Sequence, residues 1–439
     1  MAITGAIGII ADDLTGANDT ALQFFVRGSN TEIIFDADCS FQNHLNVGTF
    51  ALTTETRNAD AKYAAGTVWE RAVELRNNLS IEYFYKKIDS TLRGNVAVET
   101  LSVLDAIEYD AAVIAPAFIC EGRITIGGYQ LLKGVPIERT DAARDAHAPI
   151  YDSYIPDILK KQVNENLSDL IAEIGLKTIA KGAGPITTKL NELVSKGKKL
   201  IVADAVSAVD LEQIVLAITK SQYNILPVGS AGLANALSNI WLPINNKKQA
   251  IQKVIPVLPK LILSGSKNSV TLAQINKLSL DDDIKNTYFV DLKLDDILSS
   301  DSDIMAERII QNLGKNNIVT VHVGKIEEEL SEDVGRERLI DEGITKETLA
   351  SMITDYLADI AFRVRKSAKY ILITIGGETS YKCTKALECG YLQLVDCILP
   401  AISLCMDANA EFIVTKSGNM GSVTALVDII NYFKNHEKE

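Results

Sequence analysis

Short apolar runs alternate with amphipathic segments of helical period along most of the chain. The run at 6–11 (AIGIIA) predicts a buried strand, and the segment from about Gly16 to Val26 predicts the helix that follows it. Further strands are predicted at 32–35, 49–53, 83–87, 111–115 and 200–203, with helices at 61–75 and 96–106. Apolar strands that alternate with helices are typical of a mostly parallel sheet covered on both faces. The pattern therefore predicts an α/β fold.

A proline-rich break divides this pattern. Pro243, Pro256 and Pro259 flank a polar stretch, and proline disfavours both helix interiors and central strands. We therefore expect a domain at 1–240, a linker at 241–259 and a second domain at 260–439. After the break, strands are predicted at 260–264, 318–323, 370–375, 393–398 and 411–415, helices at 270–278, 346–365 and 422–433, and a solvated acidic region at 281–303. Each domain is predicted to be a mostly parallel sheet flanked by helices.

The charge balance excludes some classes of partner. The 439 residues include 57 Asp and Glu against 44 Lys and Arg, which gives a formal net charge of −13. Nucleic acid and anionic membranes would repel such a chain, and no basic run offsets the charge, so neither is expected as a partner. No stretch approaches the roughly 20 apolar residues of a membrane span, and residues 1–11 lack the basic start of a signal peptide. A cytoplasmic protein is expected.

Histidine and cysteine offer little chemistry here. The chain has four His and six Cys, without an HExxH or CxxC pattern, so neither a zinc site nor a disulfide scaffold is predicted. Any metal is expected to be a hard ion held by carboxylates and phosphate.

The first candidate turn is ADDLTGA at 11–17, directly after the first predicted strand. Ligands of open α/β sheets bind beyond the carboxyl ends of strands. Asp12 or Asp13 could cap the following helix, but one cap needs only one acid, so we predict a functional role for the pair. A phosphatase of the haloacid-dehalogenase type is excluded, because Ala11 stands where its nucleophilic Asp would be.

The second candidate turn is KKIDSTLRG at 86–94. Lys87 and Arg93 could hold a carboxylate, and Asp89 could accept hydrogen bonds from hydroxyls, as a polyhydroxy acid requires. A solvated, charged helix cap is the alternative. Arg57, after another strand, could add a further cation. The segment from Pro116 to Gly128 predicts a shaped loop.

Glycine-rich turns follow predicted strands in the second half of the chain, at 264–266 (SGS), 376–379 (GGET) and 416–421 (KSGNMG). Glycine lets the backbone approach a phosphate, and the free amides of a helix N-terminus favour the anion. A tight turn or helix C-cap could explain each one alone. No Walker A pattern and no GxGxxG that opens a helix occurs, so neither a P-loop nor a dinucleotide domain is predicted.

These motifs, in this order, resemble the four-carbon acid sugar kinases from about residue 5 to 433. The resemblance implies a sugar-acid-binding domain followed by a nucleotide-binding domain, and the phosphorylation of threonate, erythronate or 3-oxo-tetronate with ATP and Mg²⁺. It implies substrate contacts from Asp13, Arg57, Lys87, Ile88, Asp89, Ser90 and Arg93. It implies nucleotide contacts from Ser264, Ser266, Gly376, Gly377, Glu378, Thr379, Lys416, Gly418, Asn419, Met420 and Gly421. The sequence departs from the family pattern at Ile119, which replaces a proline, and in GGET and SGNMG, which replace GGDTA and AGGFG.

The expected activity is an ATP-dependent kinase in which Asp13, or its neighbour Asp12, orients the attacking hydroxyl and takes its proton, while Lys87 and Arg93 hold the substrate carboxylate. A non-catalytic sugar-acid sensor is the main alternative, although it would not need the glycine turns. An aldolase or isomerase of sugar phosphates is a further alternative. It would need a Schiff-base lysine or a set of metal-binding histidines, and the small number of His residues disfavours it. The sequence leaves open which acid and which hydroxyl react, and whether the chain forms a homo-oligomer.

Overall fold

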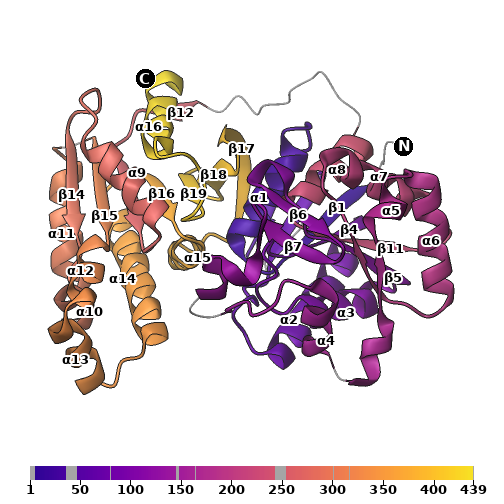
Figure 1. Cartoon of the computed structure of the whole chain (residues 1–439). Helices are drawn as coiled ribbons and strands as arrows, with labels where there is room; N and C mark the ends of the chain where they lie inside the picture. Colours follow the sequence, from indigo (N-terminus) through magenta and orange to yellow (C-terminus); the bar gives the residue numbers. More distant parts are fainter. Residues whose placement is uncertain are drawn as a thin grey trace. The chain divides into compact units, whose positions relative to one another are not determined.

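The computed structural model describes residues 5–35, 47–79, 81–144, 148–163, 165–242, 254–299, 301–315 and 317–438. The chain divides into two compact units, residues 1–249 and 250–439, and the prolines at 256 and 259 lie near the start of the second (Figure 1). Most of the predicted linker, residues 243–253, lies outside the described residues.

The N-terminal unit contains a parallel sheet. Its strands lie in the order β2 (Thr31–Ile34), β3 (Thr49–Thr53), β1 (Ala6–Ala11), β4 (Ile81–Lys87), β11 (Ile225–Gly229), β5 (Ala111–Ala115), β10 (Leu200–Ala203) and β9 (Ile171–Ile174). Neighbouring strands pair in parallel, so the carboxyl ends of β3, β1 and β4 meet at one edge. The predicted strand at 6–11 matches β1, whereas β9 and β11 were not predicted.

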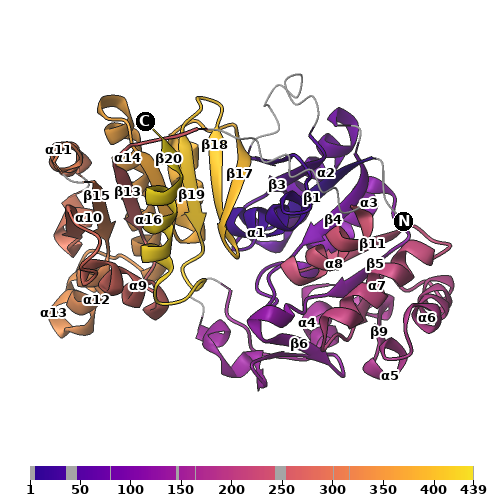
Figure 2. The ribbon, with the colours of Figure 1, turned by 90° about the horizontal axis from the view of Figure 1, so that it is seen from above.

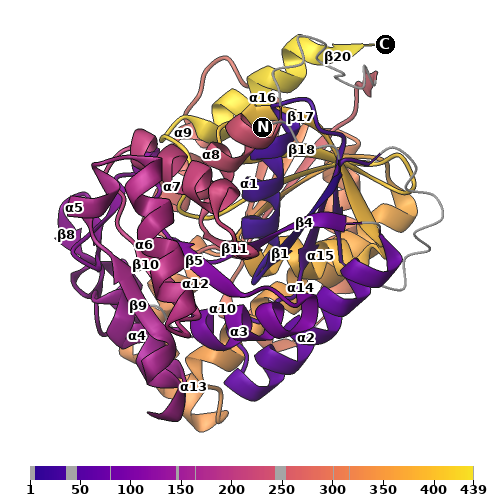
Figure 3. The same ribbon diagram turned by 90° about the vertical axis from the view of Figure 1, so that its right-hand side faces the viewer.

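Helices cover both faces of this sheet (Figure 3). One face carries α1 (Leu14–Phe25), α8 (Ala231–Trp241), α7 (Ala208–Lys220) and α6 (Ala183–Ser195), and the other carries α2 (Ala61–Asn78), α3 (Val96–Ile107) and α4 (Ile155–Gln162). Buried aliphatic and aromatic side chains from β1, β3, β4, α2 and α3 form a continuous core. The predicted shaped loop at 116–128 includes β6 (Arg123–Ile126), which forms a small antiparallel sheet with β7 (Tyr129–Leu132) and β8 (Val135–Pro136) beyond the predicted segment.

The sheet of the C-terminal unit is mixed. Its order is β14 (Thr287–Asp291), β15 (Ile318–His322), β13 (Lys260–Ser264), β16 (Ile371–Ile375), β19 (Phe412–Lys416), β18 (Ile402–Asp407) and β17 (Tyr391–Leu399). The strands from β14 to β19 are parallel, whereas β18 runs antiparallel to both of its neighbours. The sequence pattern missed β18, which follows β17 after a tight turn and so completes a hairpin.

The helices of this unit also lie on both faces of the sheet (Figure 2). α9 (Ser269–Ser279) packs beside α16 (Ala425–His436), and α14 (Lys346–Ser367) packs between α11 (Ser302–Leu313) and α15 (Gly377–Ala386). The remaining helices are α10 (Leu294–Ser299), α12 (Gly324–Ser331) and α13 (Asp333–Asp341). The acidic stretch at 281–303 exposes most of its Asp side chains, as expected, but it also supplies β14 and α10, whose apolar side chains Val290, Leu294 and Ile297 are buried.

Candidate functional site

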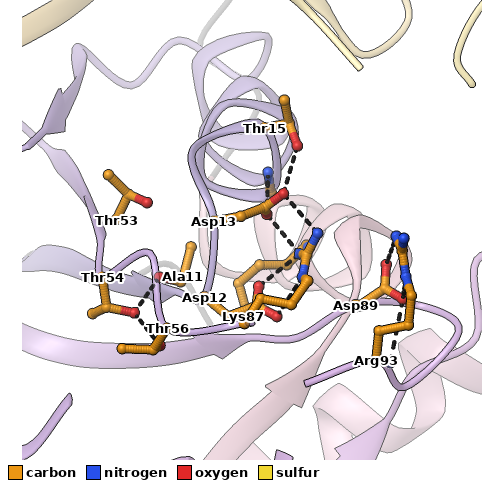
Figure 4. A network of polar contacts seen from close by, with 12 residues as sticks. Ala11, Asp12, Asp13, Thr15, Thr53, Thr54, Thr56, Lys87, Asp89 and Arg93 are labelled. Carbon is orange, nitrogen blue, oxygen red and sulfur yellow. Dashed lines mark hydrogen bonds and ion pairs between the residues drawn. The ribbon is translucent and has the colours of Figure 1, made fainter. Parts of the chain in front are cut away.

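An acidic cluster forms around Arg57 where the loops after β1 and β3 meet (Figure 4). The Arg57 guanidinium donates to Asp12 through Nε (2.9 Å) and Nη2 (2.8 Å). It donates to Asp13 through both Nη atoms, each at 2.6 Å. Both carboxylates are therefore held by one cation, and the structure brings together three of the residues that the sequence singled out.

Asp13 also caps α1. Its Oδ1 accepts from the Gly16 backbone N–H at 2.8 Å, and its Oδ2 accepts from the Thr15 hydroxyl at 2.7 Å. Asp12 takes no part in the cap, so capping does not explain why two acids stand here. Burial works to raise the pKa of Asp12, but Arg57, with help from Lys87 and Lys86, holds that pKa below its usual value. Asp12 is therefore an anion at neutral pH.

Lys87, at the end of β4, is buried, with only 5% of its surface exposed. Its ammonium lies so close to α1 that a Cβ atom at Gly16 would come within 2.7 Å of its Nζ. Unlike Arg57, it forms no side-chain hydrogen bond or ion pair with the residues that the structure describes. The nearby Asp12 carboxylate compensates part of this charge, and the carboxylate of a ligand could bind the ammonium directly.

Asp89 and Arg93 pair with each other across the turn that follows β4. The Arg93 guanidinium donates to Asp89 through Nε at 2.8 Å and through Nη2 at 3.1 Å. Although burial opposes it, Arg93 together with Arg57 holds the pKa of Asp89 well below its usual value. Ile88, which precedes Asp89, is a core residue, so only its backbone could face a ligand.

The hairpin of β6 and β7 supports the same turn. The buried Gln130 side chain donates to the Ser90 carbonyl at 2.8 Å. The carboxylate of Asp204, at the end of β10, accepts from the backbone N–H groups of Gly127 and Gly128 at 2.8 and 2.9 Å. Sequence reasoning missed Gln130 and Asp204, because neither belongs to a recognisable motif and both act through partners distant in the chain.

Glu55 is a further residue that sequence reasoning missed. Its backbone has φ = 52°, which is unfavourable for a residue with a Cβ atom. Its Oε1 accepts from the Thr53 hydroxyl at 2.5 Å. Burial, reinforced by the nearby Asp13 carboxylate, raises the pKa of Glu55 to about 8. Strained residues with displaced pKa values gather at functional sites, and the only signal in the sequence was the loop's place after a strand.

A cavity of about 280 Å³ adjoins the acidic cluster within the N-terminal unit. Arg57 lines it, together with Leu92, Gly94, Asn95, Tyr151, Lys161 and Gln162 among others. This volume is near the lower end of the range for small-molecule pockets.

In the C-terminal unit the three glycine turns lie against one another. The Thr271 hydroxyl bridges two of them, with 2.6 Å to the Gly418 carbonyl and 3.1 Å to the Ser266 hydroxyl. A Cβ atom at Gly418 would stand 2.3 Å from the Ser266 Oγ, and one at Gly265 would stand 2.5 Å from the Thr379 Oγ1. Gly376 has φ = 111°, a conformation that requires glycine. These close approaches explain why glycine recurs in all three turns.

The turn at 416–421 begins with a buried lysine, Lys416. The Lys416 ammonium donates to the Ser417 carbonyl at 2.9 Å, and burial lowers the pKa of Lys416 to about 8. Within the described residues Lys416 has no carboxylate partner. The Ser264 hydroxyl, two strands away in the same sheet, is buried without a hydrogen bond among the described residues. Asn419 accepts from the Ser417 hydroxyl at 2.9 Å, and Gln274 on α9 donates to the carbonyls of Met420 and Gly421. Gly377 opens α15.

Glu378 is the carboxylate among these turns. It is paired with Lys382 at 3.2 Å and accepts from the Thr354 hydroxyl. Within the described ranges, no group of three or more His, Cys, Asp or Glu side chains could hold a metal ion. A divalent ion beside Glu378 would therefore take most of its ligands from phosphate and water, which is usual for Mg²⁺ in kinases. No helix of the described part of the chain is long and apolar enough to cross a membrane.

Comparisons with known proteins identify the family to which the chain belongs. Residues 7–237 match the model of a sugar-binding N-terminal domain, and residues 261–426 match that of a nucleotide-binding C-terminal domain. The chain belongs to the four-carbon acid sugar kinase family, which confirms the resemblance found in the sequence.

Similar proteins match over nearly the whole chain. The chain is 27% identical to a D-threonate kinase of Salmonella typhimurium over 97% of this chain and 98% of the relative. It is also 27% identical to a D-erythronate kinase of Heliobacterium modesticaldum over 97% of this chain and 96% of the relative. A crystal structure of a Haemophilus influenzae protein shares the fold, with a TM-score of 0.72 and 21% identity over 98% of this chain and 99% of that one. The predicted α/β fold class is confirmed.

Proposed function

We propose that this protein transfers the γ-phosphoryl group of ATP to a hydroxyl, the terminal one, of a four-carbon sugar acid: D-threonate, D-erythronate or 3-oxo-tetronate. The observation that carries the proposal is the buried Lys87 side chain, which lies beside the acidic cluster of Asp12, Asp13 and Arg57 and forms no hydrogen bond or ion pair with the described residues. A sugar acid supplies both the carboxylate that Lys87 lacks and the hydroxyl that the acids can accept from.

We assign the proton acceptor to Asp13, because its side chain is 13% exposed, against 4% for Asp12. The substrate oxygen attacks the γ-phosphorus, the bond from that phosphorus to the β–γ bridging oxygen breaks, ADP leaves, and the hydroxyl proton passes to Asp13. Arg57 keeps Asp12 ionised and holds both acids in orientation. Lys87 and Arg93 hold the substrate carboxylate, with Asp89 and the backbone of Ile88 and Ser90 beside its hydroxyls.

In this proposal the N-terminal unit binds the sugar acid, and the glycine turns of the C-terminal unit bind ATP. Their packed backbones and the helix N-terminus at Gly377 suit phosphate oxygens, and Lys416 adds a positive charge. Mg²⁺ would be held by the phosphates and Glu378, where it would neutralise charge on the transferring group. We expect the reaction in the cytoplasm, with small molecules as the only required partners.

The decisive experiment is a panel of four-carbon acids assayed for ADP release, beside calorimetry with MgATP alone. We expect ADP release with at least one acid, and MgATP binding without any acid. Binding of an acid with no detectable MgATP binding would instead favour the non-catalytic sensor.

A further inference from the structure

A second charged pair lies beneath the acidic cluster, deeper in the N-terminal unit. The Lys86 Nζ of β4 and the Glu99 Oε2 of α3 are 2.7 Å apart, and their side chains are 0% and 1% exposed. Replacing a fully buried ion pair by apolar residues is often neutral or stabilising, because the desolvation of two charges offsets their attraction. Stability alone therefore does not account for this pair.

The pair connects α3 to two of the loops that carry the site. Besides binding Glu99, the Lys86 ammonium donates to the Lys87 carbonyl at 3.0 Å. The other carboxylate oxygen of Glu99 accepts from the Thr56 hydroxyl at 2.8 Å. Successive side chains of a strand point to opposite faces, so Lys86 turns to α3 while Lys87 turns to α1 and the acidic cluster. The pair therefore holds the Lys87 carbonyl, on the peptide bond that leads from β4 into the turn.

From Thr56 the contacts continue to the third loop. The Thr56 hydroxyl oxygen lies 2.7 Å from that of Thr54, whose hydroxyl donates to the Ala11 carbonyl at 2.9 Å. The backbone N–H of Arg57 donates to the Asp12 carbonyl at 3.2 Å. These hydrogen bonds and contacts connect the loops after β1, β3 and β4. The Lys86–Glu99 pair attaches this network to α3.

We propose that Lys86 and Glu99 are a positioning pair that sets the loops carrying Arg57 and Lys87 for the sugar acid. This inference rests on the proposed function for its kinetic consequence. Neither residue touches the proposed substrate; both act through Thr56 and the Lys87 backbone. Small displacements of groups that bind a reacting substrate have large effects on rate and affinity.

The test uses the double variant Lys86→Met/Glu99→Leu, which removes both charges and keeps the volume apolar. The matched control is Lys260→Met/Glu437→Leu, which removes a largely buried pair of the C-terminal unit. We expect the first double variant to stay folded and to raise the KM for the sugar acid by about tenfold or more, with the KM for ATP unchanged. The control should leave the KM for the sugar acid unchanged.

Thr56→Val removes the hydroxyl bridge alone and keeps the shape of the side chain, so it serves if the double variant does not fold. We expect a smaller rise in the same KM. Amide hydrogen exchange of the wild-type chain and both variants provides a readout that needs no substrate. Exchange within residues 54–58 and 87–93 should accelerate in each variant, whereas exchange in the core strand β5 should not.

The outcomes separate the two proposals. If the wild-type chain phosphorylates no four-carbon acid, the proposed function fails, while hydrogen exchange still decides whether the pair orders these loops. If the double variant and Thr56→Val both keep wild-type exchange rates and wild-type KM, the pair is only structural and the inference is overturned.

Discussion

The two units differ in the kind of contact that holds the residues at their strand ends in position. In the N-terminal unit, charged side chains hold one another in place, as Arg57 holds Asp12 and Asp13 and Arg93 holds Asp89. In the C-terminal unit, backbone and hydroxyl contacts hold the turns in place. The Thr271 hydroxyl bridges two of these turns, and there is no room for a side chain at Gly418. Each unit leaves one buried ammonium without a carboxylate partner among the described residues, Lys87 in the first and Lys416 in the second.

This difference matches the chemistry of two kinds of ligand. A sugar acid presents one carboxylate and several hydroxyls at fixed angles, which charged and directional side chains can distinguish. A polyphosphate presents many equivalent oxygens, which a concave backbone with free N–H groups binds without the need for a particular side chain. Substitutions should therefore act differently at the two edges.

The largest effect is expected from Gly418→Val. The new side chain would overlap Ser266 and separate two of the glycine turns, so MgATP binding should fall below detection by calorimetry. Sugar-acid affinity should stay within about twofold, because the change lies in the other unit. Gly314→Val is the control, since a Cβ atom there comes no closer than 3.7 Å to its neighbours. Loss of sugar-acid binding with MgATP binding retained would contradict the division of labour.

Asp13→Asn should leave the fold and ATP affinity intact and lower kcat by about 10²–10⁴-fold. Asparagine is a good helix N-cap, so the change removes the proton acceptor while it keeps the cap on α1. Steady-state kinetics and thermal unfolding measure the two effects separately. Near-normal kcat at saturating substrate would refute the assignment of the base. A larger loss in Asp12→Asn would exchange the roles of the two acids.

Arg93→Ala should raise the KM for the sugar acid by at least about tenfold, since the loss of a charged hydrogen bond costs roughly 1.5–3 kcal/mol. The Arg93 side chain is 27% exposed and pairs with Asp89. Kinetics at several acid concentrations measure the effect. If Arg93 serves only the structure of the turn, the melting temperature should fall instead and KM should not change.

The affinity for MgATP should decrease severalfold as the pH rises from 7.5 to about 9. The pKa of Lys416 is lowered by burial to about 8, so the free protein loses this positive charge over that range. In the ligand-free fold the same shift makes the charged lysine unfavourable, so its contribution to stability should improve as the pH rises from about 8 toward 10.5. Calorimetry across this pH range should give a flatter profile for Lys416→Met. An equal slope in wild type and variant would exclude Lys416 as the source.

The smallest effect is expected from Glu55→Gln. The pKa of Glu55 is raised from 4.5 to about 8, so its ionisation opposes folding progressively as the pH rises between those values. Glutamine keeps an acceptor for Thr53 and carries no charge. The variant should therefore melt a few degrees higher than wild type at pH 8.5 and nearly equal to it at pH 4.5. The same difference at both pH values would show that the charge of Glu55 is not the cause.

Much of the fold could be predicted from the local pattern of apolar and polar residues. β1 and β10 are continuous apolar runs because both faces of a parallel sheet are covered, and such runs are visible without tertiary information. β14 was missed because its residues belong to an acidic stretch and it lies at the edge of its sheet, where burial imposes less of a pattern. β9 has only four residues and was missed because a short strand depends on its neighbours, and β18 was missed because it depends on hairpin pairing with β17.

The sequence by itself determined the order of the units, the acidic turn at 12–13, the basic turn at 86–93 and the glycine turns, because each depends on residues adjacent in the chain. Only the tertiary structure decided which groups are paired and which are free. Arg57 binds both acids, Glu99 of α3 binds Lys86 of β4, and Lys87 forms no ion pair among the described residues, because contacts between distant residues set these pairings. Burial, which moves the pKa values of Glu55 and Lys416, is likewise a property of the packed chain and not of its local sequence.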